Sequence, residues 1–265
     1  MGHNFPKGEI MQKHNAIACM VALLCLFGPS ARSQDTPVAA AAKAAELPSG
    51  ESILDKYIEA VGGKEAFKKV KNVVSKGIVA GTGMSGNLTT YRATPNLFVF
   101  VMEIEVPTAG KILQGFDGKN GWGVTPRGPQ VMSDKETNDM KNQNVFTEDW
   151  RAMYSKVETL GLEIIDGEEC YKVAMTPKAG SALTNFYSKK TGLLLRSDVS
   201  DGRTVVQFCN KDYRKVDGMM FPLQTTIAPG GMVMVTMTFS EIKINADIPA
   251  TTFDPPPEVK ALLNK

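Results

Sequence analysis

The pattern of apolar and polar positions changes twice along the chain. Residues 16–27 form an unbroken apolar run, residues 49–71 place apolar side chains at helical spacing, and from residue 73 onward apolar and polar positions alternate between tight-turn sequences. Periods near 3.6 and 2 are typical of amphipathic helices and half-buried strands, respectively. The sequence therefore predicts a targeting segment, a short helical region and then a sheet.

The first apolar run predicts a cleaved signal peptide. It is shorter than the roughly 20 residues needed to cross a bilayer, and Gly28-Pro29 ends it. Small residues in Ala31-Arg32-Ser33 favour cleavage before Gln34. We therefore predict a signal peptide over residues 1–33, with residues 1–10 as an upstream extension, and a periplasmic location. A buried core helix is the alternative interpretation.

Cleavage at this site changes the composition of the working protein. Both histidines, His3 and His14, leave with the signal, and basic and acidic residues become equal in number. Ser-His-Asp catalysis, Cys-His catalysis and histidine-ligated zinc are thereby excluded, and a neutral chain gives no sign of nucleic-acid binding. The run Gly81–Gly86 (GTGMSG) has dinucleotide-like spacing, but no helical pattern follows it. We predict no metal and no cofactor.

Two pairs of reactive side chains remain. Cys170 and Cys209 lie in strand-like segments of an exported chain, where a disulfide and two buried thiols are both compatible with the sequence. Glu103 and Glu105 share one face of a strand, and paired carboxylates could hydrolyse glycosides if a cleft separated them correctly. A solvated outer face is the simpler interpretation. A carboxylate-dependent hydrolase is kept as the least favoured function.

The helical region follows a flexible Ala/Pro linker over residues 34–48. Ser49 is placed to cap the first helix, and Gly62-Gly63 ends it, because glycine adopts the left-handed C-cap conformation at little cost. A second short helix covers residues 64–71. The predicted core-facing positions of the two helices are Ile53, Leu54, Tyr57, Ile58, Val61, Phe67 and Val70.

Turn sequences divide the remainder of the chain into strands. Asp-Gly between alternating apolar runs is the strongest short hairpin signal. Consecutive hairpins predict an antiparallel meander, and the lack of strand–helix–strand alternation argues against a doubly wound fold. The Asp-Gly turns are at residues 117–118, 166–167, 201–202 and 217–218, and predicted strands cover residues 96–106, 169–176, 184–188, 193–199, 204–212 and 232–244.

Two features interrupt the regular strands. In the last predicted strand the apolar face switches between Phe239 and Ile242, which predicts a bulge in a curved sheet. Between residues 133 and 150 strand formers are few, Ser133–Glu136 fits a capping box, and Thr147 is placed to cap a short helix. We therefore predict a helical insertion in the sheet between about residues 126 and 155. Long insertions often form lids over binding sites. A helix that plugs one end of the sheet is equally compatible.

Short phrases spread over residues 49–256 resemble one known family. They are ILDKYIEAVGGKEAFKKVK at 53–71, GFDG at 115–118 with Gly121-Trp122, Thr191-Gly192-Leu193, and DYRKVDG at 212–218 followed by Phe221-Pro222. Together they resemble the bacterial outer-membrane lipoprotein-sorting family, the LolA/LolB/LppX-like proteins and their uncharacterised exported members. The resemblance implies an unclosed antiparallel β-barrel whose helices plug or lid an apolar cavity for the acyl chains of lipoproteins or other lipids. The chain has no acceptable lipobox, so it departs from the membrane-anchored members.

These features predict one mostly-β domain over residues 49–265 that carries lipid or lipoprotein and has no enzymatic activity. Each methylene kept from water is worth about 0.8 kcal/mol, so carriage needs an apolar cavity rather than a nucleophile. Its partners would be a lipid or acylated lipoprotein and an envelope protein, with peripheral or transient membrane contact. A structural or adaptor module of the cell envelope is the alternative. The predicted cavity residues are Phe98, Phe100, Met102, Ile104, Tyr171, Val173, Met175, Val233, Val235, Met237 and Phe239, with Trp150 and Met153 in a lid.

Overall fold

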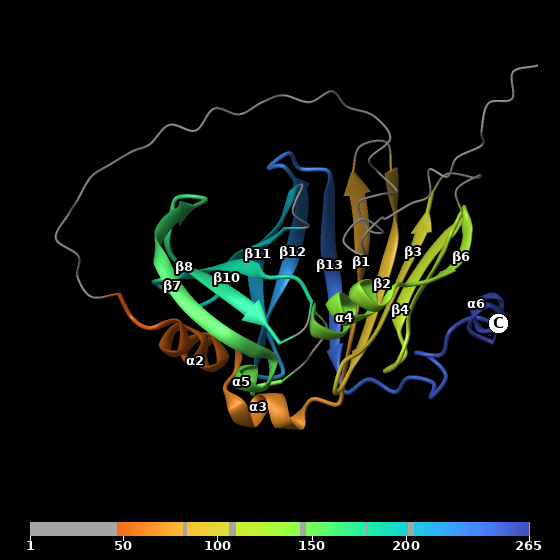
Figure 1. Cartoon of the computed structure of the whole chain (residues 1–265), viewed down its shortest axis with the longest axis horizontal. Helices are drawn as coiled ribbons and strands as arrows, with labels where there is room; N and C mark the ends of the chain where they lie inside the picture. The colour runs from red at the N-terminus through yellow and green to blue at the C-terminus, as the bar shows by residue number, and fades with distance from the viewer. Residues whose placement is uncertain are drawn as a thin grey trace, which may run out of the picture.

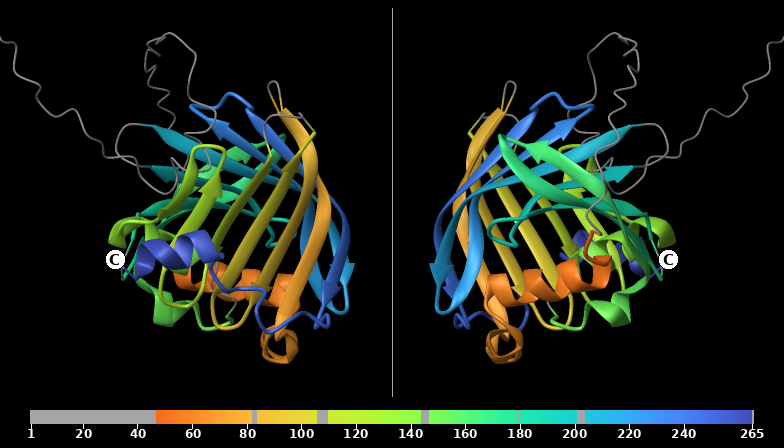
Figure 2. Two further views of the ribbon diagram at one scale, coloured as in Figure 1. Left: turned by 90° about the vertical axis from the view of Figure 1, so that its right-hand side faces the viewer. Right: turned by 90° about the vertical axis from the view of Figure 1, so that its left-hand side faces the viewer.

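The computed structural model describes residues 47–81, 84–105, 110–143, 147–178, 180–200 and 204–264. The predicted signal peptide, nearly all of the linker and the Asp201-Gly202 turn lie outside the described residues. The described strands form a single 13-stranded sheet in the order β6-β5-β4-β3-β2-β1-β13-β12-β11-β10-β9-β8-β7. The sheet is strongly curved, and its two edge strands, β6 and β7, are not paired with each other (Figures 1 and 2).

All neighbouring strands that the structure pairs are antiparallel, which confirms the predicted meander. The elements are α2 (Gly50–Val61), α3 (Lys64–Lys69), β1 (Asn72–Gly81), β2 (Met84–Ala93), β3 (Leu97–Ile104), β4 (Lys111–Phe116), β5 (Gly121–Thr125), β6 (Gly128–Val131), α4 (Asp134–Gln143), α5 (Trp150–Met153), β7 (Tyr154–Ile165), β8 (Glu168–Pro177), β9 (Leu183–Ser188), β10 (Leu194–Ser200), β11 (Val205–Val216), β12 (Met219–Pro229), β13 (Val235–Ile244) and α6 (Pro257–Leu263).

Local chemistry accounts for the main boundaries. The Ser49 hydroxyl accepts a hydrogen bond from the Ser52 N–H at 3.2 Å, and Gly62 ends α2 with a positive φ of 140°. Both residues of Asp166-Gly167 and of Asp217-Gly218 have positive φ. This is the conformation that the twist of a two-residue hairpin requires. These caps and turns confirm the sequence predictions.

The predicted insertion is the connection between the two edges of the sheet. The chain leaves β6 at one edge, passes through α4 and α5, and resumes as β7 at the other edge (Figure 1). The capping box is confirmed, because the Ser133 N–H donates to Glu136 Oε2 at 2.8 Å. Two details of the prediction were wrong. Residues 128–131 are strand β6, and α5 begins at Trp150 after Asp149, while Thr147 only accepts from the Asp149 N–H.

The predicted face switch in the last strand is also confirmed. The pairing of β1 with β13 shifts register between Lys76 and Gly77, which leaves Ser240 as the extra residue. The predicted start at residue 232 was wrong, because the Gly230-Gly231 turn carries Met232 and Val233 out of the sheet, where they are exposed.

Apolar side chains occupy both faces of the curved sheet. On the convex face, Val99 and Trp122 are buried under Phe253 and Val259 from the C-terminal segment that contains α6. Helix α6, a short helix that starts after consecutive prolines, was not among the predicted elements. The C-terminal segment therefore covers part of the convex face, whereas the concave face carries the larger apolar cluster.

Candidate functional site

The concave face carries one continuous apolar cluster, which we call the concave cluster. Side chains at every second position of β3 point into it, and cross-strand pairing extends it through β2 and β1 to β13. Met140 of α4 packs against the same cluster. The residues predicted on β3 and β13, namely Phe98, Phe100, Met102, Ile104, Val235, Met237 and Phe239, all belong to it.

A second cluster, the α2 cluster, covers the part of the concave face formed by β7 to β10. Ile53, Leu54 and Ile58 of α2 are buried against the sheet. Leu183 packs against both clusters, which places them on the same face. The predicted residues Tyr171, Val173, Met175 and Trp150 all lie here. Met153 is half-buried at the end of α5, and the exposed Val233 lies outside both clusters.

A polar latch joins α5 to α2. The Trp150 indole donates to Asp55 Oδ1 at 2.9 Å, and the Arg151 guanidinium donates to both carboxylate oxygens of Asp55 at 2.9 and 2.8 Å. The guanidinium also stacks 4.0 Å from the Trp150 ring centroid. These hydrogen bonds, of which those from Arg151 have the largest effect, lower the pKa of Asp55 to about 2.

The latch predicts that part of the protein's stability is lost when the solution is acidified. Because the folded-state pKa of Asp55 is lowered, its contribution is complete above its ordinary value of about 4 and is lost as pH falls towards about 2. Asp55→Asn should therefore lower the free energy of unfolding at about pH 5 and converge with wild type near about pH 2. The side chain is partly exposed, so we expect a difference of no more than about 1 kcal/mol. Urea unfolding at both pH values measures it, and a pH-independent difference would contradict the assignment.

Helix α4 is tied to the opposite side of the curve. Asp139, which is buried, accepts hydrogen bonds from the Ser181 N–H at 2.7 Å and from the Ser181 hydroxyl at 3.2 Å. Ser181 lies just before β9, whereas α4 packs against β4 and β5. The helix therefore bridges two sides of the concave face, as a lid or a plug would.

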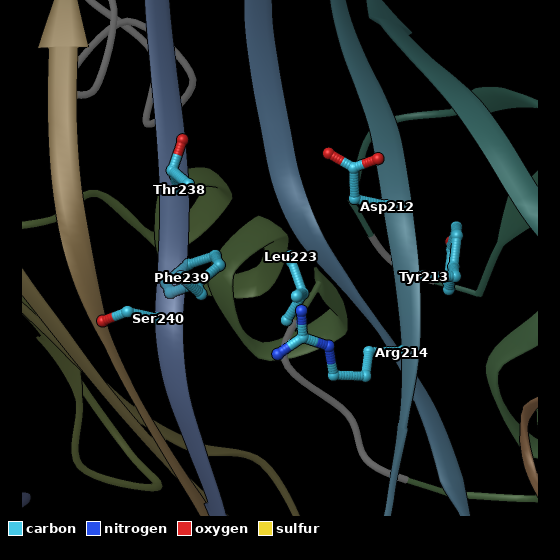
Figure 3. Close-up of a pocket in the computed structure, with 7 residues that line it drawn as sticks. All are labelled: Asp212, Tyr213, Arg214, Leu223, Thr238, Phe239 and Ser240. Atoms are coloured by element: carbon cyan, nitrogen blue, oxygen red, sulfur yellow. The ribbon is translucent and has the colours of Figure 1, made fainter.

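The sheet is split between β12 and β13. These strands pair only between Gln224–Ile227 and Val235–Thr238. Beyond the paired part, these two strands and β11 border an open hollow of about 620 Å³. In the close-up of this hollow, α4 lies behind the strands (Figure 3). Its lining combines the concave-cluster residue Phe239 with polar residues. The lining residues are Asp212, Tyr213, Arg214, Leu223, Thr238, Phe239 and Ser240.

Several polar side chains near the two clusters were missed at the sequence level. The rings of Tyr57 and Tyr187 lie 5.3 Å apart, and burial raises the pKa of both hydroxyls, so both stay protonated. The Tyr213 hydroxyl donates to the Leu194 carbonyl at 2.6 Å. Arg92 faces the concave side of β2. Arg92 lies two residues after Thr90 and four after Leu88, so strand alternation places all three on one face. This spacing could have identified Arg92 from the sequence.

The candidate groups for hydrolysis or redox chemistry are not assembled into a site. Glu103 forms an ion pair with Lys111 at 2.8 Å, Glu105 accepts from the Ser85 hydroxyl at 2.9 Å, and both carboxylates are exposed. Cys170 and Cys209 are free thiols. Among the described residues, no group of three or more His, Cys, Asp or Glu side chains could hold a metal ion. In the same part of the chain, no helix combines the length and apolar character needed to cross a membrane.

Comparison with solved structures identifies proteins of the same fold. One is a DUF1329 family protein from Desulfovibrio piger (TM-score 0.54, 17% identity), aligned over 77% of this chain and 96% of that one. A lipoprotein-sorting domain from Vibrio parahaemolyticus (0.54, 12%) is aligned over 82% and 100%. A LolA superfamily protein from Nitrosomonas europaea (0.54, 15%) is aligned over 79% and 99%. No protein-family model and no curated protein sequence matches the chain.

Proposed function

We propose that the protein is an exported, non-catalytic carrier that holds the acyl chains of a lipid or lipoprotein against its concave face. The observation that carries this proposal is the continuous apolar lining of that face, which reaches from β3 across β13 to β8. An acyl chain gains about 0.8 kcal/mol for each methylene removed from water. Such a surface therefore supplies the binding energy without any reactive group.

Uncovered apolar side chains on the same face support the proposal. Leu162 of β7 is paired with Tyr171 of the α2 cluster and is 42% exposed. Met237 and Phe239 are only partly buried within the concave cluster. On this face they give an acyl chain apolar side chains to contact, as the proposed carrier function needs. The lipoprotein-sorting and LolA superfamily structures share the fold, which favours a carrier over a hydrolase.

Native mass spectrometry of the mature protein, purified from periplasm without detergent, tests the proposal. We expect an additional mass that leaves on denaturation and is identified as a lipid or acylated peptide. The same protein, stripped and incubated with lipid extract, should regain it. An unliganded mass in both samples would contradict the carrier function and would favour the envelope adaptor, in which the protein's own side chains fill the concave face.

A further inference from the structure

Arg92 is a positive charge placed on the apolar concave face. Leu88, Thr90 and Arg92 occupy alternate positions of β2, and their cross-strand partners on β3 are Met102, Phe100 and Phe98. The intervening residue Tyr91 packs with the convex cluster instead. Strand alternation therefore directs the Arg92 side chain towards the concave side, where its Cζ lies 5.7 Å from the centroid of the Phe98 ring.

Arg92 is exposed to solvent although it faces the apolar concave side of the sheet. The protein around it lowers the pKa of its guanidinium by desolvation. Arg92 is therefore a cation beside the concave cluster rather than a side chain packed into the core.

Among the described residues, Arg92 forms no ion pair with a carboxylate, and its guanidinium lies over the Phe98 ring. An acyl chain that covered this part of the concave face would remove Arg92 from bulk water. A charge in that position is normally paired or hydrogen-bonded, because leaving it alone costs several kcal/mol. The planar guanidinium fork matches carboxylate and phosphate oxygens in particular.

The apolar row next to Arg92 has the direction and length of an extended chain. From Phe98, opposite Arg92, the inward-facing positions continue through Phe100 and Met102 to Ile104; the first three are buried and Ile104 is partly buried. Six residues of strand span about 20 Å. Arg92 stands at one end of this row, and the Tyr57 hydroxyl, kept protonated by burial, is near enough to interact with it.

We propose that Arg92 is the headgroup site of the carrier: it pairs with the carboxylate or phosphate of a single-chain amphiphile whose acyl chain lies against the partly buried side chains of the concave cluster. This inference rests on the proposed carrier function and adds a ligand class to it, namely anionic rather than neutral amphiphiles. Tyr57 donates a hydrogen bond to the same anionic oxygens.

Three ligands with the same chain test the inference: oleic acid, oleyl phosphate and oleyl alcohol, measured by fluorescence displacement at mildly alkaline pH. Wild type should bind both anions more tightly than the alcohol. Arg92→Met should weaken binding of the anions roughly 10- to 100-fold, the value of a charge-assisted hydrogen bond, and leave the alcohol unchanged. Arg127→Met, which removes an exposed guanidinium from the β5–β6 turn, should change none of the three affinities.

The outcomes separate this inference from the carrier proposal. If Arg92→Met weakens all three ligands equally, or none, Arg92 is not the headgroup site and the carrier function stands. If Arg92→Met does not fold, the wild-type affinities alone test the inference. Equal wild-type affinities for the anions and the alcohol would overturn it, and tighter binding of the anions would support it. If wild type binds none of the three, the carrier proposal and this inference both fail. If Arg92→Met weakens the binding of just one of the two anions, that anion shows whether a carboxylate or a phosphate is recognised.

Discussion

Met237→Asp is expected to abolish lipid retention, while Thr238→Asp leaves it unchanged. The two residues are neighbours on β13, but Met237 faces the concave cluster, opposite Val79 and Thr225, and Thr238 is exposed at the split in the sheet. A carboxylate at position 237 must lose its hydration when an acyl chain is bound beside it. This costs several kcal/mol, so we expect affinity to fall by roughly 100-fold or more.

Native mass spectrometry of both variants after periplasmic expression measures the effect. Because Met237 is only partly buried, its substitution should be better tolerated by the fold than the same change at the buried Phe100. Circular dichroism and thermal melting verify that both variants are folded. Full lipid content in folded Met237→Asp would place the ligand elsewhere than the concave cluster.

Trp122→Ala should cost about 3–5 kcal/mol of stability, whereas Trp122→Phe should cost far less. Trp122 is 2% exposed between the sheet and the C-terminal segment. Alanine leaves a large cavity under Phe253 and Val259. Phenylalanine keeps most of the ring volume and removes an indole N–H that has no hydrogen-bond partner among the described residues, and an unsatisfied buried donor is itself unfavourable.

Urea unfolding of the two variants beside wild type gives the free energies. A loss of 3–5 kcal/mol is a large fraction of the total stability of a domain, so Trp122→Ala should also release the C-terminal segment to proteolysis. Equal stabilities for the two variants would show that the C-terminal segment is not held by ring packing.

The same residues explain why one sequence phrase stands out. A Cβ atom at Gly115 would lie 2.3 Å from Trp122 Cζ2 on the neighbouring strand. Glycine is therefore required where the indole lies flat across β4. The spacing between GFDG and Gly-Trp in the sequence places Gly115 opposite Trp122 on neighbouring strands. The need for glycine at position 115 could not be predicted from the sequence.

Local signals in the sequence determined the elements of this protein. Caps, Asp-Gly turns and two-residue alternation act over a few residues, so they were sufficient for the Ser49 cap, the capping box at Ser133, the antiparallel meander and the bulge near Ser240. They also placed the apolar rows of β3 and β13 on single faces. They failed at Met232 and Val233, where apolar composition resembled a strand but the preceding glycine pair formed a turn.

Only the tertiary structure decided how these elements meet. The pairing of β1 with β13, the Asp55 latch and the bridge from Asp139 to Ser181 all join segments far apart in the chain. Such contacts depend on the closure of long loops, and no local period records them. Arg92 shows this best. In the sequence it is an ordinary charge in a strand, and it becomes a candidate ligand site because folding places it beside the concave cluster without a carboxylate partner among the described residues.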